Sequence, residues 1–317
     1  MCDADRVDGG RIAAALGLGR VLDCRAVTGG VMNLNWRLTT DAGTFAVKQL
    51  RDRTPDEIRV VNELLPRLAR DGFPVPTPHG DPVRVDGEWY TATSWLNGVH
   101  PENATLRDDL GELVGRLHVA LAERCPPAPR RLPDVPEDPV KTIKALAGYA
   151  VRPPADDFDR SAALEIEWRR AMLAELVDRR PADAELAPCG WTHGDLQPFN
   201  LLVDADGRVA GILDWDRLGV RPYGLEVVRT ATIVFGRSLD RIAAFVAGYR
   251  AHVPITNDQL ADAAHRRWWT LLTETWQLER HYEHDDRGCD HLLARRGDYL
   301  RWWTAHRAEV TAAFTAG

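Results

Sequence analysis

Three polar side chains near the middle of the chain have the types and spacing that phosphoryl transfer to a hydroxyl requires. They lie in the stretch His193–Asn200 and in the Asp-Trp-Asp triplet at 214–216: Asn200 follows Asp195 by five positions, and Asp214 follows it by nineteen. Such a reaction uses one carboxylate to orient the attacking hydroxyl and accept its proton, and an amide with a second carboxylate to hold Mg²⁺ on the nucleotide phosphates. The pattern indicates a site that moves phosphate to a hydroxyl.

The segment between these residues is predicted to fold back on itself. Apolar runs at 201–203 and 209–213 have strand character, and the Asp-Ala-Asp-Gly sequence at 204–207 has the composition of a hairpin turn. Antiparallel pairing across this turn would set Asn200 beside Asp214. Two oxygen ligands would then face one cation, as Mg²⁺ prefers. The alternative is a chance grouping in a surface loop, and several matching elements in order argue against it.

The stretch resembles the aminoglycoside phosphotransferase family, whose relatives include choline and homoserine kinases. That family carries a His-Gly-Asp-x-x-x-x-Asn loop and an Ile-Asp-Trp/Phe-Asp/Glu strand end, matched here by His193 to Asn200 and by Leu213 to Asp216. The resemblance implies that Asp195 is the catalytic base and that Asn200 and Asp214 are metal ligands.

The same comparison disfavours a protein substrate. Gly194 stands where protein kinases have the arginine that usually reads a phosphorylated activation loop. Only about ten residues separate Asp216 from the helix-like run near Leu225, too few for a long peptide-binding segment. A small molecule with a free hydroxyl is therefore the expected substrate.

The implied fold class is α+β, a bilobal protein-kinase-like fold. Residues 1–97 are predicted to form an amino-terminal lobe of antiparallel sheet with a helix, and residues 98–317 a mostly helical carboxy-terminal lobe. The second lobe would hold the catalytic loop at 191–216, a helical insertion at about 140–185 and substrate-side helices at 236–317. The insertion either caps the substrate or only packs, and the sequence leaves both readings open.

Lys48 is the residue of the first lobe expected to bind nucleotide phosphate. Only three of the 40 basic residues are lysines, so a lysine retained here has a specific task. Lys48 lies in the strand-like run 44–50, which is predicted to pair with 35–39 across the turn at 41–43. A compact ammonium on a rigid strand suits the α- and β-phosphates of ATP, although a solvated strand lysine is the alternative.

The other nucleotide-site predictions rest on position relative to Lys48. Gly29 and Gly30 stand where kinases place a glycine-rich flap. Thr54 is predicted to cap a helix with Glu57 closing a capping box, and Pro66 to kink that helix. The resemblance makes Glu63 the carboxylate that pairs with Lys48, with Glu57 as the fallback. It also places Ser94 and Leu96 at the inter-lobe hinge, where backbone groups bind the purine.

Composition limits the classes of partner and the cellular location that we expect for this protein. A net charge of −7 disfavours nucleic acid as a partner. No apolar stretch has the length that a membrane-spanning helix needs, and the first residues lack the pattern of a secretory signal, so we expect a cytoplasmic protein without a membrane partner. Five scattered cysteines without a Cys-x-x-Cys pair argue against a disulfide framework and a structural zinc site.

The carboxy-terminal fifty residues hold the predicted substrate wall. Five tryptophans lie there, and for any single one of them core packing is the favoured interpretation. Glu274, Gln277 and Arg280 recur at helical spacing and are expected to share one helix face turned to the substrate. Asp195 and Asp216 are expected to contact the acceptor from the catalytic side.

The predicted function is ATP- and Mg²⁺-dependent transfer of the γ-phosphate to a small-molecule hydroxyl, with the choice between ATP and GTP left open. An antibiotic-modifying resistance kinase, acting on an aminoglycoside-type or another hydroxylated antibiotic, is the first interpretation, because the resemblance points there. A metabolic kinase for homoserine, choline or an amino sugar is the second. A catalytically silent nucleotide-binding regulator is the third, although it should have lost one of four residues that are all present: Lys48, Asp195, Asn200 and Asp214.

Overall fold

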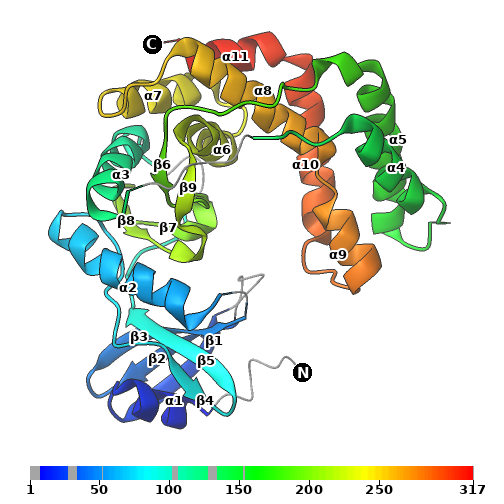
Figure 1. Ribbon diagram of the computed structural model, residues 1–317. Coiled ribbons are helices and arrows are strands. Elements are labelled where there is room, and N and C mark those ends of the chain that lie inside the picture. The colour runs from blue at the N-terminus through cyan, green and yellow to red at the C-terminus, as the bar shows by residue number, and fades with distance from the viewer. Residues whose placement is uncertain are drawn as a thin grey trace. The chain divides into compact units, whose positions relative to one another are not determined.

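The computed structural model describes residues 8–27, 34–51, 53–101, 106–127, 134–152 and 154–316 (Figure 1). The chain forms two compact units: unit 1 comprises Met1–Ala128 and Trp191–Gly219, and unit 2 comprises Pro129–Gly190 and Val220–Gly317. An antiparallel sheet precedes a helical carboxy-terminal part, which is the predicted fold class. The units divide the chain differently from the predicted lobes, because the stretch with Asp195 and Asp214 shares a unit with the amino-terminal sheet.

The sheet of unit 1 contains the hairpin that the sequence predicts around Lys48. Its order is β1-β2-β3-β5-β4, with every adjacent pair antiparallel. The turn at 41–42 joins the strands of the predicted hairpin, and the turn at 86–87 joins those of a second hairpin. The strands are β1 (Val21–Val27), β2 (Leu34–Thr40), β3 (Gly43–Leu50), β4 (Val83–Val85) and β5 (Glu88–Ser94).

One face of this sheet packs against helix α1 (Gly9–Leu16). Ile12 and Ala13 of α1 join Phe45 and Val47 of β3 in one buried cluster. Successive side chains of a strand point to opposite faces. Lys48 therefore projects from the face opposite to α1, where it pairs across the sheet with Asn35 and Thr91.

Helix α2 (Pro55–Arg70) begins with the predicted capping box. The Thr54 hydroxyl accepts from the Glu57 amide at 3.3 Å, and the Glu57 carboxylate accepts from the Thr54 amide at 2.9 Å. The helix continues through Pro66 and buries an apolar stripe: Ile58, Val61, Leu64, Leu65 and Leu68. It contacts α3 (Leu110–Arg124) and the short 3-10 helix η4 (Trp215–Arg217).

The predicted hairpin that follows Asn200 is present in unit 1. After the 3-10 helix η3 (Pro198–Asn200), β7 (Leu201–Val203) pairs antiparallel with β8 (Val209–Ile212). Burial of Leu201 and Ile212, which face each other in the register, anchors the pair. Two further strands, β6 (Cys189–Thr192) and β9 (Gly219–Pro222), form a second two-stranded sheet, and the boundaries between the units fall within them.

Unit 2 is helical, and the predicted insertion forms helices α4 (Pro139–Ala150) and α5 (Asp157–Glu175), followed by the 3-10 helix η2 (Val177–Arg179). Its core is aromatic: Phe245, Tyr249, Trp268, Trp269, Trp303 and Phe314 are fully buried, so three of the five late tryptophans serve packing, as predicted. The remaining helices are α6 (Tyr223–Phe235), α7 (Leu239–Arg250), α8 (Asn257–Thr273), α9 (Trp276–His284), α10 (Asp290–Ala305) and α11 (Arg307–Thr315).

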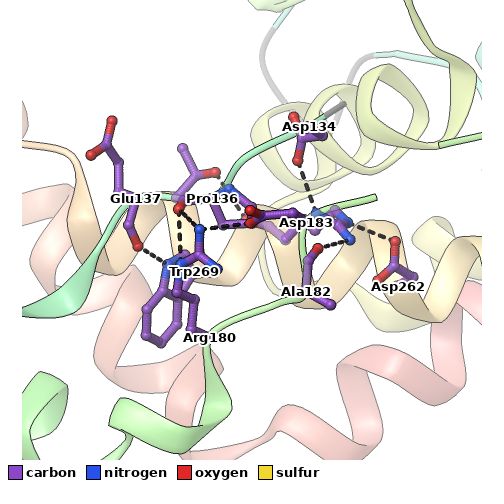
Figure 2. A network of polar contacts seen from close by, with 10 residues as sticks. Asp134, Pro136, Glu137, Arg180, Ala182, Asp183, Asp262 and Trp269 are labelled. Atoms are coloured by element: carbon purple, nitrogen blue, oxygen red, sulfur yellow. Dashed lines mark hydrogen bonds and ion pairs between the residues drawn. The ribbon is translucent and has the colours of Figure 1, made fainter. Parts of the chain in front are cut away.

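A polar network formed by residues of α8 and by Arg180, which follows η2, holds two irregular segments of unit 2 in place (Figure 2). The Trp269 indole donates to the Glu137 carbonyl at 3.0 Å, and the Arg180 guanidinium donates to the Pro136 carbonyl and to Asp183. Arg266, which is almost fully buried, donates to Asp134, Asp262 and the Ala182 carbonyl. The buried donors of Arg266 and Trp269 would be costly to leave unsatisfied, so their bonds stabilise the loops at 134–137 and 180–184.

The predicted helix face carrying Glu274, Gln277 and Arg280 is wrong in one respect. Helix α8 ends at Thr273, and Glu274 has an extended backbone (φ −67°, ψ 136°). Helix α9 starts anew at Trp276, so only Gln277 and Arg280 share a helix. The spacing was misleading because the residue types before and after the break between α8 and α9 are similar. The sequence therefore does not mark where one helix ends and the next begins.

No helix among the described residues is long and apolar enough to cross a membrane.

Candidate active site

His193 ties the loop containing Asp195 to the strand end that carries Asp214. Its fully buried imidazole accepts from the Asp195 amide at Nδ1 (3.2 Å), and Nε2 contacts the Leu213 carbonyl at 2.9 Å. With Nδ1 as acceptor, Nε2 carries the proton and donates it to that carbonyl. Gly194, at φ 85°, lies in the left-handed region where glycine meets no Cβ penalty. The sequence motif included His193, but its positioning role was not predicted.

The carboxylate of Asp195 is oriented by two amide side chains. Asn200 donates through Nδ2 to the Asp195 carbonyl at 2.8 Å and to its Oδ2 at 3.1 Å. Gln197 donates to the same Oδ2 at 3.0 Å. Hydrogen bonds that fix a carboxylate in one rotamer are what a proton acceptor needs if it is to meet a hydroxyl in a defined geometry.

The β7–β8 hairpin brings the backbone of Asn200 next to the residue that precedes Asp214. The Leu213 amide donates to the Asn200 carbonyl at 2.8 Å. Asp214 itself has φ 57°, a left-handed conformation that aspartate tolerates better than most residues, and this turns the chain out of β8.

The donor set fits a hard divalent cation. Because Asn200 uses its amide nitrogen for Asp195, its amide oxygen is the atom left for a metal ion. An amide oxygen and the carboxylate of Asp214 are the kind of ligands that Mg²⁺ takes from proteins, which supply one or two groups while phosphates and waters complete the shell.

Lys48 lies between two carboxylates of the same strand end. Its Nζ is 2.8 Å from Asp214 Oδ1 and 2.8 Å from Asp216 Oδ2. Burial opposes the charged forms of Lys48 and Asp214, but their mutual attraction prevails, so the pKa of Lys48 is raised and that of Asp214 is lowered. Lys48 and Asp214 are therefore ionised at neutral pH.

Lys48 pairs with Asp214 and Asp216, and not with the predicted partner Glu63 or with Glu57. Glu57 is committed to the helix cap and to Arg53 at 2.9 Å. Glu63 is exposed and makes no ion pair with any residue that the structure describes. The sequence could not indicate Asp214 and Asp216 as partners because they lie 166 and 168 positions away along the chain.

Two of the remaining predicted nucleotide-site residues, Ser94 and Leu96, lie among the described residues. Ser94, the last residue of β5, is bonded through its backbone N–H to the Thr77 carbonyl at 2.7 Å, and Leu96 follows two residues later beside the hairpin, close to Gly211. Gly29 and Gly30 lie outside the described residues.

Three predicted substrate residues belong to unit 2, whereas Asp195 and Asp216 belong to unit 1. Glu274 forms an ion pair with Arg296, Gln277 is buried, and Arg280 forms an ion pair with Asp286. The structure therefore groups Lys48 with Asp214 and Asp216, and Asp195 with Asn200, with His193 linking the two groups; the substrate wall stays a prediction.

The substitution Lys48→Met should show how strongly the lysine stabilises its two carboxylates. At pH 7 we expect a loss of about 1–3 kcal/mol in the free energy of unfolding, less than the 3–5 kcal/mol for fully buried pairs, because the Asp214 side chain is 43% exposed. Since the folded pKa of Asp214 lies below its unfolded value, this stabilisation is present above about pH 4 and is lost as the pH falls further.

Urea denaturation of both proteins between pH 3 and pH 8 measures this effect. The difference between wild type and Lys48→Met should shrink toward the acid end. If the difference in the free energy of unfolding were the same at pH 3 and at pH 8, the ion-pair explanation would be contradicted.

Comparison with known proteins agrees with this geometry. Residues 23–254 match the phosphotransferase enzyme family. The homoserine kinase of Methylobacillus flagellatus is 26% identical over 285 residues, 82% of this chain and 82% of that protein. The homoserine kinase of Pseudomonas aeruginosa is 30% identical over 210 residues, 62% of this chain and 60% of that protein.

Solved structures show the same fold. A spectinomycin phosphotransferase in complex with ADP and spectinomycin has a TM-score of 0.68 at 13% identity, covering 96% of this chain and 97% of that one. The choline kinase of Streptococcus pneumoniae has a TM-score of 0.57 at 14% identity, covering 95% and 100%.

The fold and the grouped lysine, carboxylates and amide define a kinase-like phosphotransferase. The chain belongs to the phosphotransferase enzyme family, and it is an enzyme that acts on small molecules with an alcohol group as acceptor.

Proposed function

We propose that this enzyme transfers the γ-phosphate of ATP to the side-chain hydroxyl of a small amino acid of the homoserine type. The observation that carries the transfer chemistry is the orientation of Asp195 by Asn200 and Gln197. In this proposal Asp195 orients the acceptor hydroxyl and takes its proton.

Nucleotide and metal binding are assigned to the same unit. Lys48 would leave its two carboxylates in part to contact the phosphates, and Asn200 and Asp214 would hold the cation, which supplies charge neutralisation on the phosphates when bound. The ADP in the spectinomycin phosphotransferase structure supports a nucleotide as the phosphate donor. Gly29, Gly30, Ser94 and Leu96 remain proposed nucleotide contacts.

The choice of acceptor rests on the sequence relatives. Homoserine kinases from several bacteria align with this chain, two of them over more than three quarters of its length. The structural neighbours at 13–14% identity support the fold and not the acceptor. Homoserine therefore replaces an antibiotic as the first choice.

A second candidate acceptor is an aminocyclitol antibiotic. The likeness to the spectinomycin phosphotransferase extends over 96% of this chain and includes the helical unit 2. The two candidates differ in charge, because homoserine carries a carboxylate that spectinomycin lacks.

A turnover assay separates the candidates. The purified enzyme with Mg²⁺ and ATP is offered homoserine, choline, spectinomycin and streptomycin in turn, and ADP formation is coupled to NADH oxidation. We expect kcat/KM for homoserine to exceed that for each other acceptor by at least about 100-fold, in the range that binding of one polar group supplies. Preference for spectinomycin would replace the homoserine proposal, and GTP in place of ATP tests the donor.

A further inference from the structure

Four helices of unit 2 bring arginine side chains together. Helix α8 contacts α5, α6 and α10, which brings Arg267 of α8 near arginines of the other three helices. Arg296 of α10 is repelled by the charges of Arg169 of α5, Arg229 of α6 and Arg267, and Arg267 is repelled by Arg229. Arg169 is held by the backbone carbonyls of Leu272 and Glu274. Arg296 forms an ion pair with the Glu274 carboxylate and lies over the Trp276 ring, with its Cζ 5.5 Å from the ring centroid.

Arg267 is the member of this cluster that lacks compensation. Among the described residues, its guanidinium makes neither a hydrogen bond nor an ion pair, and its Nε is shielded from solvent. The Nε of Arg296 is likewise shielded and without a hydrogen bond. Burial, with Arg229 adding to it, lowers the pKa of Arg267 to about 10, and burial with its arginine neighbours lowers that of Arg296 to about 9. Both remain charged at neutral pH.

The adjacent residue on α8 shows what a structural arginine looks like in this unit. Arg266 has two carboxylates and one carbonyl as partners (the labelled Asp134, Asp262 and Ala182 in Figure 2). An arginine that only packs would be expected to find such partners, because leaving a shielded donor unsatisfied costs about 1–3 kcal/mol. Arg267 bears that cost without an intramolecular gain, and natural chains keep such unfavourable groups mainly where they bind something.

The arginine cluster is partly accessible to solvent. Arg267 is half-buried, and 28% of the Arg296 side chain is exposed. A guanidinium presents a planar fork of donors that matches two oxygens of a carboxylate or phosphate. A neutral or cationic group would gain nothing from these donors.

We propose that Arg267 and Arg296, supported by the charge of Arg229, form a binding site in unit 2 for an oxyanion group of a small molecule. The group is a carboxylate or a phosphate, which share this recognition chemistry. The site stands on the contacts within unit 2 and does not depend on the transfer reaction assigned to unit 1.

Binding to the full chain, measured by calorimetry without nucleotide, tests the proposal. The probes are homoserine, the analogue 2-amino-1,4-butanediol, in which an alcohol replaces the carboxylate, and inorganic phosphate. We expect wild type to bind homoserine at least about tenfold more tightly than the diol, and Arg267→Met to lose that difference. The control is Arg237→Met, which removes an exposed arginine paired with Asp298 and should bind like wild type.

The probes identify the source of the oxyanion. Homoserine binding that phosphate displaces assigns the site to carboxylates in competition with phosphate, and binding of phosphate alone assigns it to phosphate. No preference of wild type for either anion over the diol overturns the proposal. So does equal weakening by Arg267→Met and Arg237→Met.

Thermal unfolding without ligand provides the second measurement. Removal of an uncompensated charge should leave the Tm of Arg267→Met equal to or above that of wild type, whereas a structural arginine would lower it. A lowered Tm for Arg267→Met would overturn the proposal even if binding were lost. Because binding is measured without turnover, failure of the kinase proposal and failure of this site are distinguishable.

Discussion

Replacement of Asp195 by asparagine is expected to lower kcat by about 10²- to 10⁴-fold, the range that a positioned proton acceptor contributes. The substitution keeps the shape of the side chain and preserves an oxygen that Asn200 and Gln197 can bond, so the loop should stay folded. What it removes is the negative charge that accepts the proton of the hydroxyl. Nucleotide affinity should change little, because Lys48 and Asp214 are untouched.

Steady-state turnover with the best acceptor and nucleotide binding by calorimetry measure these two quantities separately. Asp206→Asn is the matched control: it makes the same change of charge in the nearby hairpin turn, where Asp206 only pairs with exposed Arg208 at 3.3 Å. Its kcat should equal that of wild type. Equal turnover in wild type and Asp195→Asn would remove Asp195 from the role of base.

The parts of this site that the sequence predicts are those fixed by local physics. The β7–β8 hairpin follows from two short apolar runs around an Asp-Gly turn, and the capping box of α2 from the spacing of Thr54 and Glu57. The strand of Lys48 follows from the alternation that buries Phe45 and Val47 against α1. Each of these signals lies within about ten residues of sequence, the range in which turn, cap and strand patterns act.

The parts that the sequence does not predict depend on contacts between distant segments. The pairing of Lys48 with Asp214 and Asp216 joins positions more than 160 apart. The positioning role of His193 depends on a backbone carbonyl 20 positions away, and a carbonyl leaves no mark in residue type. The sequence also cannot show that Arg267 lacks an ion-pair partner among the described residues. The adjacent Arg266 is the same residue type, and it is paired with two carboxylates.

The pairing of Lys48 explains why the two acidic residues of the Asp-Trp-Asp triplet should not be interchangeable. Asp214 lies at the hairpin end, one residue after the amide that bonds Asn200, and so carries the proposed metal site as well as a bond to Lys48. Asp216 lies in η4, is the more buried of the two, and contacts the same lysine. Substitution of Asp214 should therefore affect cation binding, and substitution of Asp216 should affect the lysine without removing a proposed metal ligand.

Asp214→Asn is expected to raise the Mg²⁺ concentration for half-maximal activity by at least about tenfold, because loss of even an outer partner of a metal ligand commonly costs that much affinity. An amide in place of the carboxylate keeps an oxygen ligand but removes the charge that attracts the cation, so high Mg²⁺ should restore part of the activity. Asp216→Asn serves as the comparison, since it also removes one carboxylate from Lys48 but should leave the Mg²⁺ dependence as in wild type. Titration of activity with Mg²⁺ at saturating nucleotide measures both variants, and an unchanged Mg²⁺ requirement in Asp214→Asn would mean that this carboxylate serves the lysine and not a metal ion.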